Sequence, residues 1–473
     1  MVDPSVEYGA VGARRFHHQR QPVGWRRPGI AGVVEGLVFG AAVFALMLAA
    51  YYLWLEPGRY LAAAGEAIAR KVASFGIRGL PAYVALGCFY SVIHSFRGLE
   101  ASAFHAVSLL LHAVNAVLAY LLVFRLFKSR TVGLITGLLL GLHPIHVDAV
   151  AWASDLKDVM SGTFVFLTLL AYVQFTRTRR HGWYWLSLSL YALALLSKPM
   201  AALLAFLLLI VDYQQRLANR RHDVLEKVPY LLLAVILGWI SYHGQTMGTA
   251  ARAGTDLSFY SSSNAWSAFG FYIVKLISPA RLSVLYGSEH VYWWSVSATV
   301  LCVTFVSMTV WMLMLSRDYG FGLAWFVLFA TPILGFIPFG YVVRLAPYAN
   351  HFMYLADVGL FVCAGLIVRD SLRVLPDRVS RITLKVISVA VLVTFAVMTW
   401  VRCSVWKDSV ALWTDAIRYN TKPNATIGHY RLAQAQLEAG RRDEAIRQAR
   451  LALKAHPGNT KARALLNDLE AGE

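Results

Sequence analysis

GLEASAFHAVSLLLHAVNAVLAYLLVF, residues 98–124, is an apolar stretch that three basic residues follow closely, Arg125, Lys128 and Arg130. Its part from 102 to 124 is long enough to cross a bilayer as a helix, which takes about 20 apolar residues. A basic cluster at the end of such a run is typical of the cytoplasmic end of a span. This stretch therefore predicts a membrane helix with a defined direction.

The rest of the chain is also rich in apolar residues and poor in charged ones. Of its 473 residues 58% are hydrophobic and only 15% are charged, whereas soluble domains carry about 25% charged residues. The surplus apolar surface must therefore face lipid. The formal net charge of +18 comes from basic clusters between apolar runs, which is the pattern of membrane orientation and not of nucleic-acid binding. We expect an all-α, polytopic membrane helical bundle with no nucleic-acid partner.

Apolar runs predict about eleven spans. A cytoplasmic basic tail (1–30) would put every later basic cluster on the inside. The runs 81–97 and 265–280 are expected to be interfacial or re-entrant, because counting 81–97 as a span would put three basic clusters outside. The predicted spans lie near 31–54, 102–124, 131–143, 160–176, 183–197, 199–213, 228–243, 294–315, 321–341, 352–368 and 383–402.

The composition changes after the last span, where Arg, Glu, Asp, Gln and Ala replace the apolar runs. Pro423 and Pro457 are separated by 34 residues, the period of a tetratricopeptide repeat, and Gly440 lies at the turn between two helical patterns. We therefore expect a transmembrane domain at 31–402 and an extracytoplasmic repeat region at 403–473. One such unit is marginal alone, so it should dock on the membrane domain or on a protein partner.

The outer loops hold the candidate site residues. Residues 141–162, GLHPIHVDAVAWASDLKDVMSG, contain His143, His146, Asp148, Asp155, Lys157 and Asp158. Charged residues at membrane depth are costly and usually have a function. Both a metal site and a phosphate-binding cluster fit these residue types. The alternative is that Pro144 caps a short helix and the charges only face water.

A second cluster lies in residues 343–361, VRLAPYANHFMYLADVGLF. Its candidate residues are Arg344, His351 and Tyr354. The Arg344 guanidinium could bind two oxygens of a phosphate. The alternative is an aromatic and basic belt at the membrane interface.

Taken together, these stretches resemble a known family. Segments 98–124, 143–161, 191–213, 275–286 (KLISPARLSVLY) and 350–360 (NHFMYLADVGL), followed by the repeat, are similar to the transmembrane and tetratricopeptide-repeat glycosyltransferases. The resemblance runs from about residue 98 to the end. It implies a GT-C-like fold and a sugar donor carried on a polyprenyl phosphate.

In that family a loop acid deprotonates the acceptor hydroxyl and cationic groups stabilise the departing lipid phosphate. The resemblance implies Glu56 or Asp148 as the base, with Lys157, Arg344 and His351 around the phosphate and Tyr354 nearby. Six positions match the family as they stand: His143, His146, Asp148, Lys157, Asp158 and Lys198.

Two departures open an alternative. The first outer loop lacks the family's adjacent aspartates and offers only Glu56 and Glu66. Asn350 and His351 replace the family's pair of an acid and an arginine. The alternative function is a catalytically inactive GT-C-like scaffold or assembly subunit that docks partners through its repeat.

The expected location is a bacterial inner membrane, with the N-terminus cytoplasmic and the repeat periplasmic or extracellular. The expected partners are membrane lipid, a polyprenyl-phosphate sugar and a protein bound by the repeat. No residue is assigned to a metal, and a divalent metal cofactor stays open.

Overall fold

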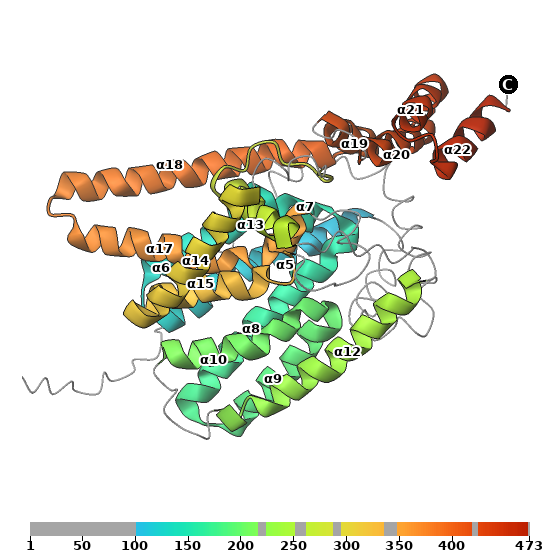
Figure 1. The fold of residues 1–473 in the computed structure, drawn as a ribbon. Coiled ribbons are helices and arrows are strands. Elements are labelled where there is room, and N and C mark those ends of the chain that lie inside the picture. The colour runs from blue at the N-terminus through green and yellow to red at the C-terminus, as the bar shows by residue number, and fades with distance from the viewer. Residues whose placement is uncertain are drawn as a thin grey trace, which may run out of the picture.

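A computed structural model describes residues 101–215, 224–250, 262–286, 295–334, 348–418 and 424–471. Over these ranges the regular structure is entirely helical, as predicted: a bundle is followed by a smaller group of helices beyond the end of α18 (Figure 1). The basic tail, the predicted span at 31–54 and the interfacial run at 81–97 lie outside the described residues, as do Glu56 and Arg344.

The long helices follow the apolar runs. α5, α8 and α18 are each long and apolar enough to cross a membrane, and α6 with residues 144–151 forms a bent pair that could be a fourth span. The chain is thus an integral membrane protein, and the larger number of spans stays a prediction. The bundle helices are α5 (Ala101–Phe127), α6 (Arg130–Leu142), α8 (Leu156–Thr178), α9 (His181–Ser197), α10 (Leu204–Gln214), α12 (Val228–Ala250), α13 (Ser262–Ile277), α14 (Ser295–Leu315), α15 (Arg317–Ala330), α17 (Asp357–Val374) and α18 (Arg378–Cys403).

Basic turns gather at one end of the bundle, which we call the basic end. Arg177 Nη2 donates to Arg125 O at 2.6 Å, so the α8–α9 turn contacts the α5–α6 turn. Arg369 Nη1 lies 3.1 Å from Asp318 Oδ2 and joins α17 to the start of α15. Gln214 Nε2 donates to Leu126 O at 3.4 Å. These basic turns therefore lie close together. Their charge had predicted that they share one side of the membrane.

The opposite end, which we call the loop end, is built from short elements. They are η2 (Pro144–His146), α7 (Val147–Ala151), η3 (Ala153–Asp155), η4 (Pro199–Leu203) and η7 (Asn350–Tyr354). Pro144 and Pro199 each stand at the start of a 3-10 helix, where the missing N–H of proline costs least. The chain breaks at Lys198, between the predicted runs 183–197 and 199–213.

Two glycines bring α15 and α17 together. A Cβ placed on Gly359 would lie 2.2 Å from Gly322 O, and one on Gly322 would lie 2.6 Å from Gly359 O. Only glycine allows such a close approach of two helix backbones. This contact fixes the start of α17 and hence η7, which directly precedes it.

The C-terminal helices are α19 (Ser409–Arg418), α20 (Asn424–Glu438), α21 (Arg442–Ala455) and α22 (Thr460–Glu470). Gly440 turns the chain between α20 and α21 with φ +74°, a conformation that favours glycine. A Cβ on Gly428 would lie 2.6 Å from Ile417 Cγ2, so α19 packs closely on α20. The two helices and their turn form where the repeat pattern predicted them, and their assignment to the tetratricopeptide family stays a prediction.

Candidate functional site

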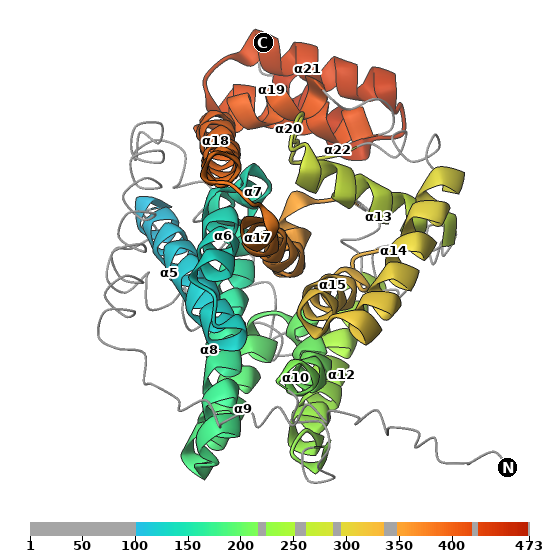
Figure 2. The same ribbon diagram turned by 90° about the vertical axis from the view of Figure 1, so that its left-hand side faces the viewer.

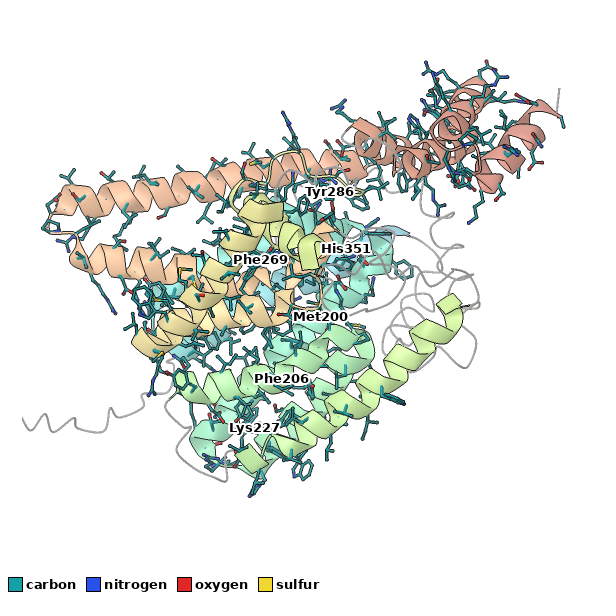
Figure 3. All side chains as sticks on the ribbon, viewed as in Figure 1. Met200, Phe206, Lys227, Phe269, Tyr286 and His351 are labelled. Carbon is teal, nitrogen blue, oxygen red and sulfur yellow. The ribbon has the colours of Figure 1, made fainter. Side chains whose placement is uncertain are left out.

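Five residues from three separate segments converge at the loop end: Asp155, Lys157, Asp158, Lys198 and His351. We call them the lysine–aspartate cluster. Lys198 Nζ lies 2.8 Å from Asp158 Oδ2, and Lys157 pairs with Asp155. His351 Nδ1 lies 3.3 Å from Asp155 Oδ2. In Figure 3, His351 lies at the loop end close to Tyr286, whereas Lys227 lies at the far end of the bundle.

The cluster is partly open on its cationic side. The Asp155 and Asp158 side chains are 3% and 1% exposed, whereas those of Lys157 and Lys198 are 22% and 15% exposed. Asp158 Oδ1 accepts no hydrogen bond from the described residues. Two ammonium groups held over buried carboxylates can thus be reached by an anionic ligand, which would form charge-assisted bonds with them.

Burial and neighbouring charges shift the pKa values of two groups in the cluster, Asp155 and His351. Burial raises the pKa of Asp155, but His351, Lys157 and Lys198 outweigh it and hold that pKa below its ordinary value. Burial lowers the pKa of His351, and Asp155 and Asp158 oppose this only in part. At pH 7 the Asp155 carboxyl is therefore ionised and the His351 imidazole is neutral.

Asp155, Asp158 and His351 also form a set that could hold a metal ion, because their ligand atoms lie within 4.8 Å of one another. Carboxylate oxygens and an imidazole nitrogen suit several divalent cations. However, Lys157 and Lys198 already pair with the two carboxylates. An ion would have to displace both ammonium groups, so the arrangement favours an anion over a cation.

We therefore expect metal removal to leave the protein unchanged. EDTA should shift the thermal unfolding midpoint of the purified protein by less than about 1 °C, the shift that a loss of about 1 kcal/mol causes in a chain of this length at about 2.1 cal/mol/K per residue. A larger drop that Mn²⁺ restores in the wild type, but not in Asp158→Asn, would contradict the anion assignment.

Asp148 lies in a second network at the loop end. Its Oδ2 accepts from Asn350 Nδ2 at 2.7 Å, and its Oδ1 accepts from Trp406 Nε1 at 3.1 Å and from Arg402 Nη2 at 3.2 Å. The sequence did not single out Arg402, although a charged residue at the end of the apolar run 383–402 is a signal of function. Arg402, a permanent cation, thus shares the Asp148 carboxylate with Asn350.

The remaining predicted residues lie in the interior. His143 Nε2 contacts Leu276 O at 2.9 Å, and His146 Nδ1 contacts Leu140 O at 2.8 Å. Tyr354 OH lies 2.8 Å from His112 Nδ1. These side chains are buried inside the bundle, and Tyr354 lies near enough to Asp158 to interact with its charge.

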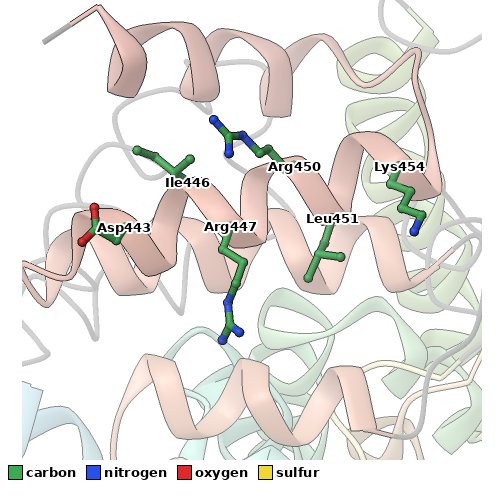
Figure 4. Close-up of a pocket in the computed structure, with 6 residues that line it drawn as sticks. All are labelled: Asp443, Ile446, Arg447, Arg450, Leu451 and Lys454. Carbon is green, nitrogen blue, oxygen red and sulfur yellow. The ribbon is translucent and has the colours of Figure 1, made fainter. Parts of the chain in front are cut away.

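A shallow groove of about 390 Å³ lies along α21. Figure 4 shows that all six residues lining it come from this one helix: Asp443, Ile446, Arg447, Arg450, Leu451 and Lys454. Two of its cations are engaged, because Arg447 pairs with Glu444 at 2.7 Å and Arg450 with Glu470 at 2.8 Å. The groove is a candidate docking surface for a protein.

Comparison with known proteins places part of this chain near a family of sugar transferases. Residues 85–243, about a third of the chain, match the model of the family described as dolichyl-phosphate-mannose-protein mannosyltransferase. The matched region includes Asp155, Lys157, Asp158 and Lys198, and excludes His351.

Curated relatives match over a short segment. Protein O-mannosyl-transferase tmtc2 of Xenopus laevis is 39% identical over 94 residues, which is 19% of this chain and 11% of that protein. Protein O-mannosyl-transferase TMTC1 of Homo sapiens is 37% identical over 86 residues, which is 18% of this chain and 9% of that protein. The match thus spans about a tenth of the length of these relatives.

Among solved structures, the archaeal oligosaccharyltransferase AglB from Archaeoglobus fulgidus, in complex with an inhibitory peptide and a dolichol-phosphate, is similar with a TM-score of 0.43 and 12% identity. The likeness covers 85% of this chain and 60% of that one.

Proposed function

We propose that this protein transfers a sugar from a polyprenyl-phosphate carrier to an acceptor on the non-cytoplasmic side of a membrane. The observation that carries the proposal is the convergence of Asp155–Asp158, Lys198 and His351 into one charged cluster at the end of the bundle opposite the basic end. The family match over residues 85–243 supports it, because it includes both lysines.

In the proposed reaction the bond between the sugar C1 and the phosphate oxygen breaks, and the phosphate leaves with the electron pair. Lys157 and Lys198 bind the phosphate and stabilise the charge that develops on it, which is usually a large contribution to such catalysis. The acceptor oxygen bonds to C1, and a carboxylate takes its proton. Both lysines must first exchange a carboxylate partner for the phosphate.

The base is Glu56 or Asp148. Asp148 accepts hydrogen bonds from Arg402, Asn350 and Trp406, which occupy most of its lone pairs and leave little room for an acceptor hydroxyl. We therefore favour Glu56 as the base and assign Asp148 to holding the surrounding loops.

A direct test uses purified protein in liposomes with mannosyl phosphoryl polyprenol, because the matched family is described as using mannose on dolichyl phosphate. Release of polyprenyl phosphate should depend on the protein and on an added acceptor fraction, which takes the sugar. No release with any acceptor fraction would favour the scaffold alternative, for which the α21 groove is the supporting observation.

The orientation can be tested by labelling. We propose that the loop end and the repeat region face the non-cytoplasmic side, because the basic clusters gather at the other end. Arg441→Cys, at an exposed position after α20, should react with an impermeant maleimide in intact cells. Arg180→Cys, exposed at the basic end, should react only after the cells are opened, and the reverse pattern would invert the map.

A further inference from the structure

Arg402 connects the C-terminal helices to the candidate site. We infer that Arg402 is a positioning residue, which holds η7 in place and couples α19 to the lysine–aspartate cluster. The functional importance of this coupling rests on the proposed function, whereas the coupling itself can be measured without it.

The Arg402 side chain is 6% exposed and lies between two carboxylates. Its Nη1 donates to Asp415 Oδ2 at 2.7 Å, and Asp415 belongs to α19. Its Nη2 donates to Asp148 Oδ1 at 3.2 Å, and Asp148 belongs to α7. Nη1 also donates to Leu282 O at 2.8 Å. One guanidinium thus joins the C-terminal helices, a loop-end helix and the 278–286 loop.

The network continues from Asp148 into η7. Asn350 Nδ2 donates to Asp148 Oδ2 at 2.7 Å and to Ser283 O at 3.1 Å. Tyr286 OH donates to Asn350 Oδ1 at 2.9 Å. The bonds to Asn350 fix the start of η7, and the next residue, His351, is the one that reaches Asp155 at 3.3 Å.

Aromatic packing adds a second link between the same parts. Trp406, just before α19, donates to Asp148 Oδ1 at 3.1 Å. The Trp152 ring lies 6.4 Å from the Trp406 ring and 5.5 Å from the His351 ring. A shift of α19 that withdrew Asp415 or Trp406 would therefore loosen the contacts that hold His351.

The test measures the accessibility of His351 in the full-length protein. Diethylpyrocarbonate modification of His351, followed by mass spectrometry, should be slow in the wild type because this side chain is 9% exposed. Asp415→Asn weakens the contact between Arg402 and α19, because it replaces the carboxylate by an amide of the same shape. It should raise the His351 modification rate at least threefold, and Arg402→Met should raise it further, whereas Arg402→Lys should restore part of the protection. His181, which is exposed at the basic end, is the internal standard.

Arg369→Met is the matched control, because it removes a partly buried arginine with two carboxylate partners at the basic end. It should leave the His351 rate unchanged. If Arg402→Met does not fold, the His351 modification rate in Asp415→Asn still tests the inference. An unchanged His351 rate in Asp415→Asn overturns the inference, as does an equal rise in Arg369→Met.

A second readout separates this inference from the proposed function. Farnesyl phosphate serves as a soluble probe of the lysine–aspartate cluster, and its affinity should fall at least fivefold in Asp415→Asn. If the wild type does not bind the probe but the His351 rate still rises in the variant, the coupling stands and the proposed function fails. If the wild type binds the probe and Asp415→Asn leaves both the affinity and the His351 rate unchanged, the coupling fails alone.

Discussion

Replacing Lys198 by methionine is expected to lower sugar transfer by about a hundredfold or more, because removing one donor that stabilises developing negative charge costs about 10²–10³ in kcat. Lys198 lies 2.8 Å from Asp158, so the substitution also leaves a buried carboxylate without its cation. Breaking such a pair typically destabilises a protein by about 3–5 kcal/mol. The double variant Lys198→Met with Asp158→Asn removes both charges and should recover most of the stability but none of the activity.

The assay is release of polyprenyl phosphate, measured with thermal unfolding on the same samples. Lys461→Met, at an exposed position on α22, is the control and should keep full activity. Full activity in a folded Lys198 double variant would show that the cluster does not bind the donor phosphate.

The second prediction with a large expected effect concerns the residue that acts as the general base. Glu56→Gln should lower transfer by about 10²–10⁴, the range that a positioned general base contributes. Asp148→Asn should reduce activity less, because Asp148 is assigned to holding Arg402 and Asn350 and not to taking the proton. It should lower the stability more than Glu56→Gln does, because the amide removes the charge that pairs with the buried Arg402. The two amide variants are compared by kcat and by folding.

The opposite order of the two effects, or no effect in either variant, would change the assignment. If Asp148→Asn abolishes transfer in a folded protein and Glu56→Gln retains it, Asp148 is the base after all. If both keep full biological function while removal of residues 423–473 destroys it, the protein acts as a membrane-anchored docking subunit.

The helices could be predicted from the sequence because apolar runs bounded by charges or proline leave the backbone little choice in lipid. The predicted span 183–197 matches α9, and 294–315 matches α14. The boundary near 352 was less accurate. α17 starts only at Asp357, because the preceding residues form η7, whose polar side chains are held by long-range bonds that no local pattern reveals.

The candidate site was predictable only in part. The motif around Lys157 and Asp158 gave one of its segments, and Lys198 between two apolar runs gave another. His351 came from the second cluster of candidate residues, at 343–361. Arg402 was missed, because its partner Asp148 lies 254 residues away in the sequence and single-sequence patterns carry no such pairing. The role of Asp148 was also not predictable from local sequence. Its motif predicted a general base, whereas its contacts with distant residues indicate that it holds the loops in place.

Lys157 and Lys198 are proposed to bind the phosphate of a polyprenyl-phosphate lipid. This binding can be observed in a cryo-electron microscopy structure of the protein in nanodiscs with saturating polyprenyl phosphate. We expect density for the phosphate within about 3 Å of both Nζ atoms, the distance of charge-assisted hydrogen bonds, with Lys198 moved away from Asp158. A lipid phosphate bound elsewhere, with both lysine–aspartate pairs intact, would contradict it.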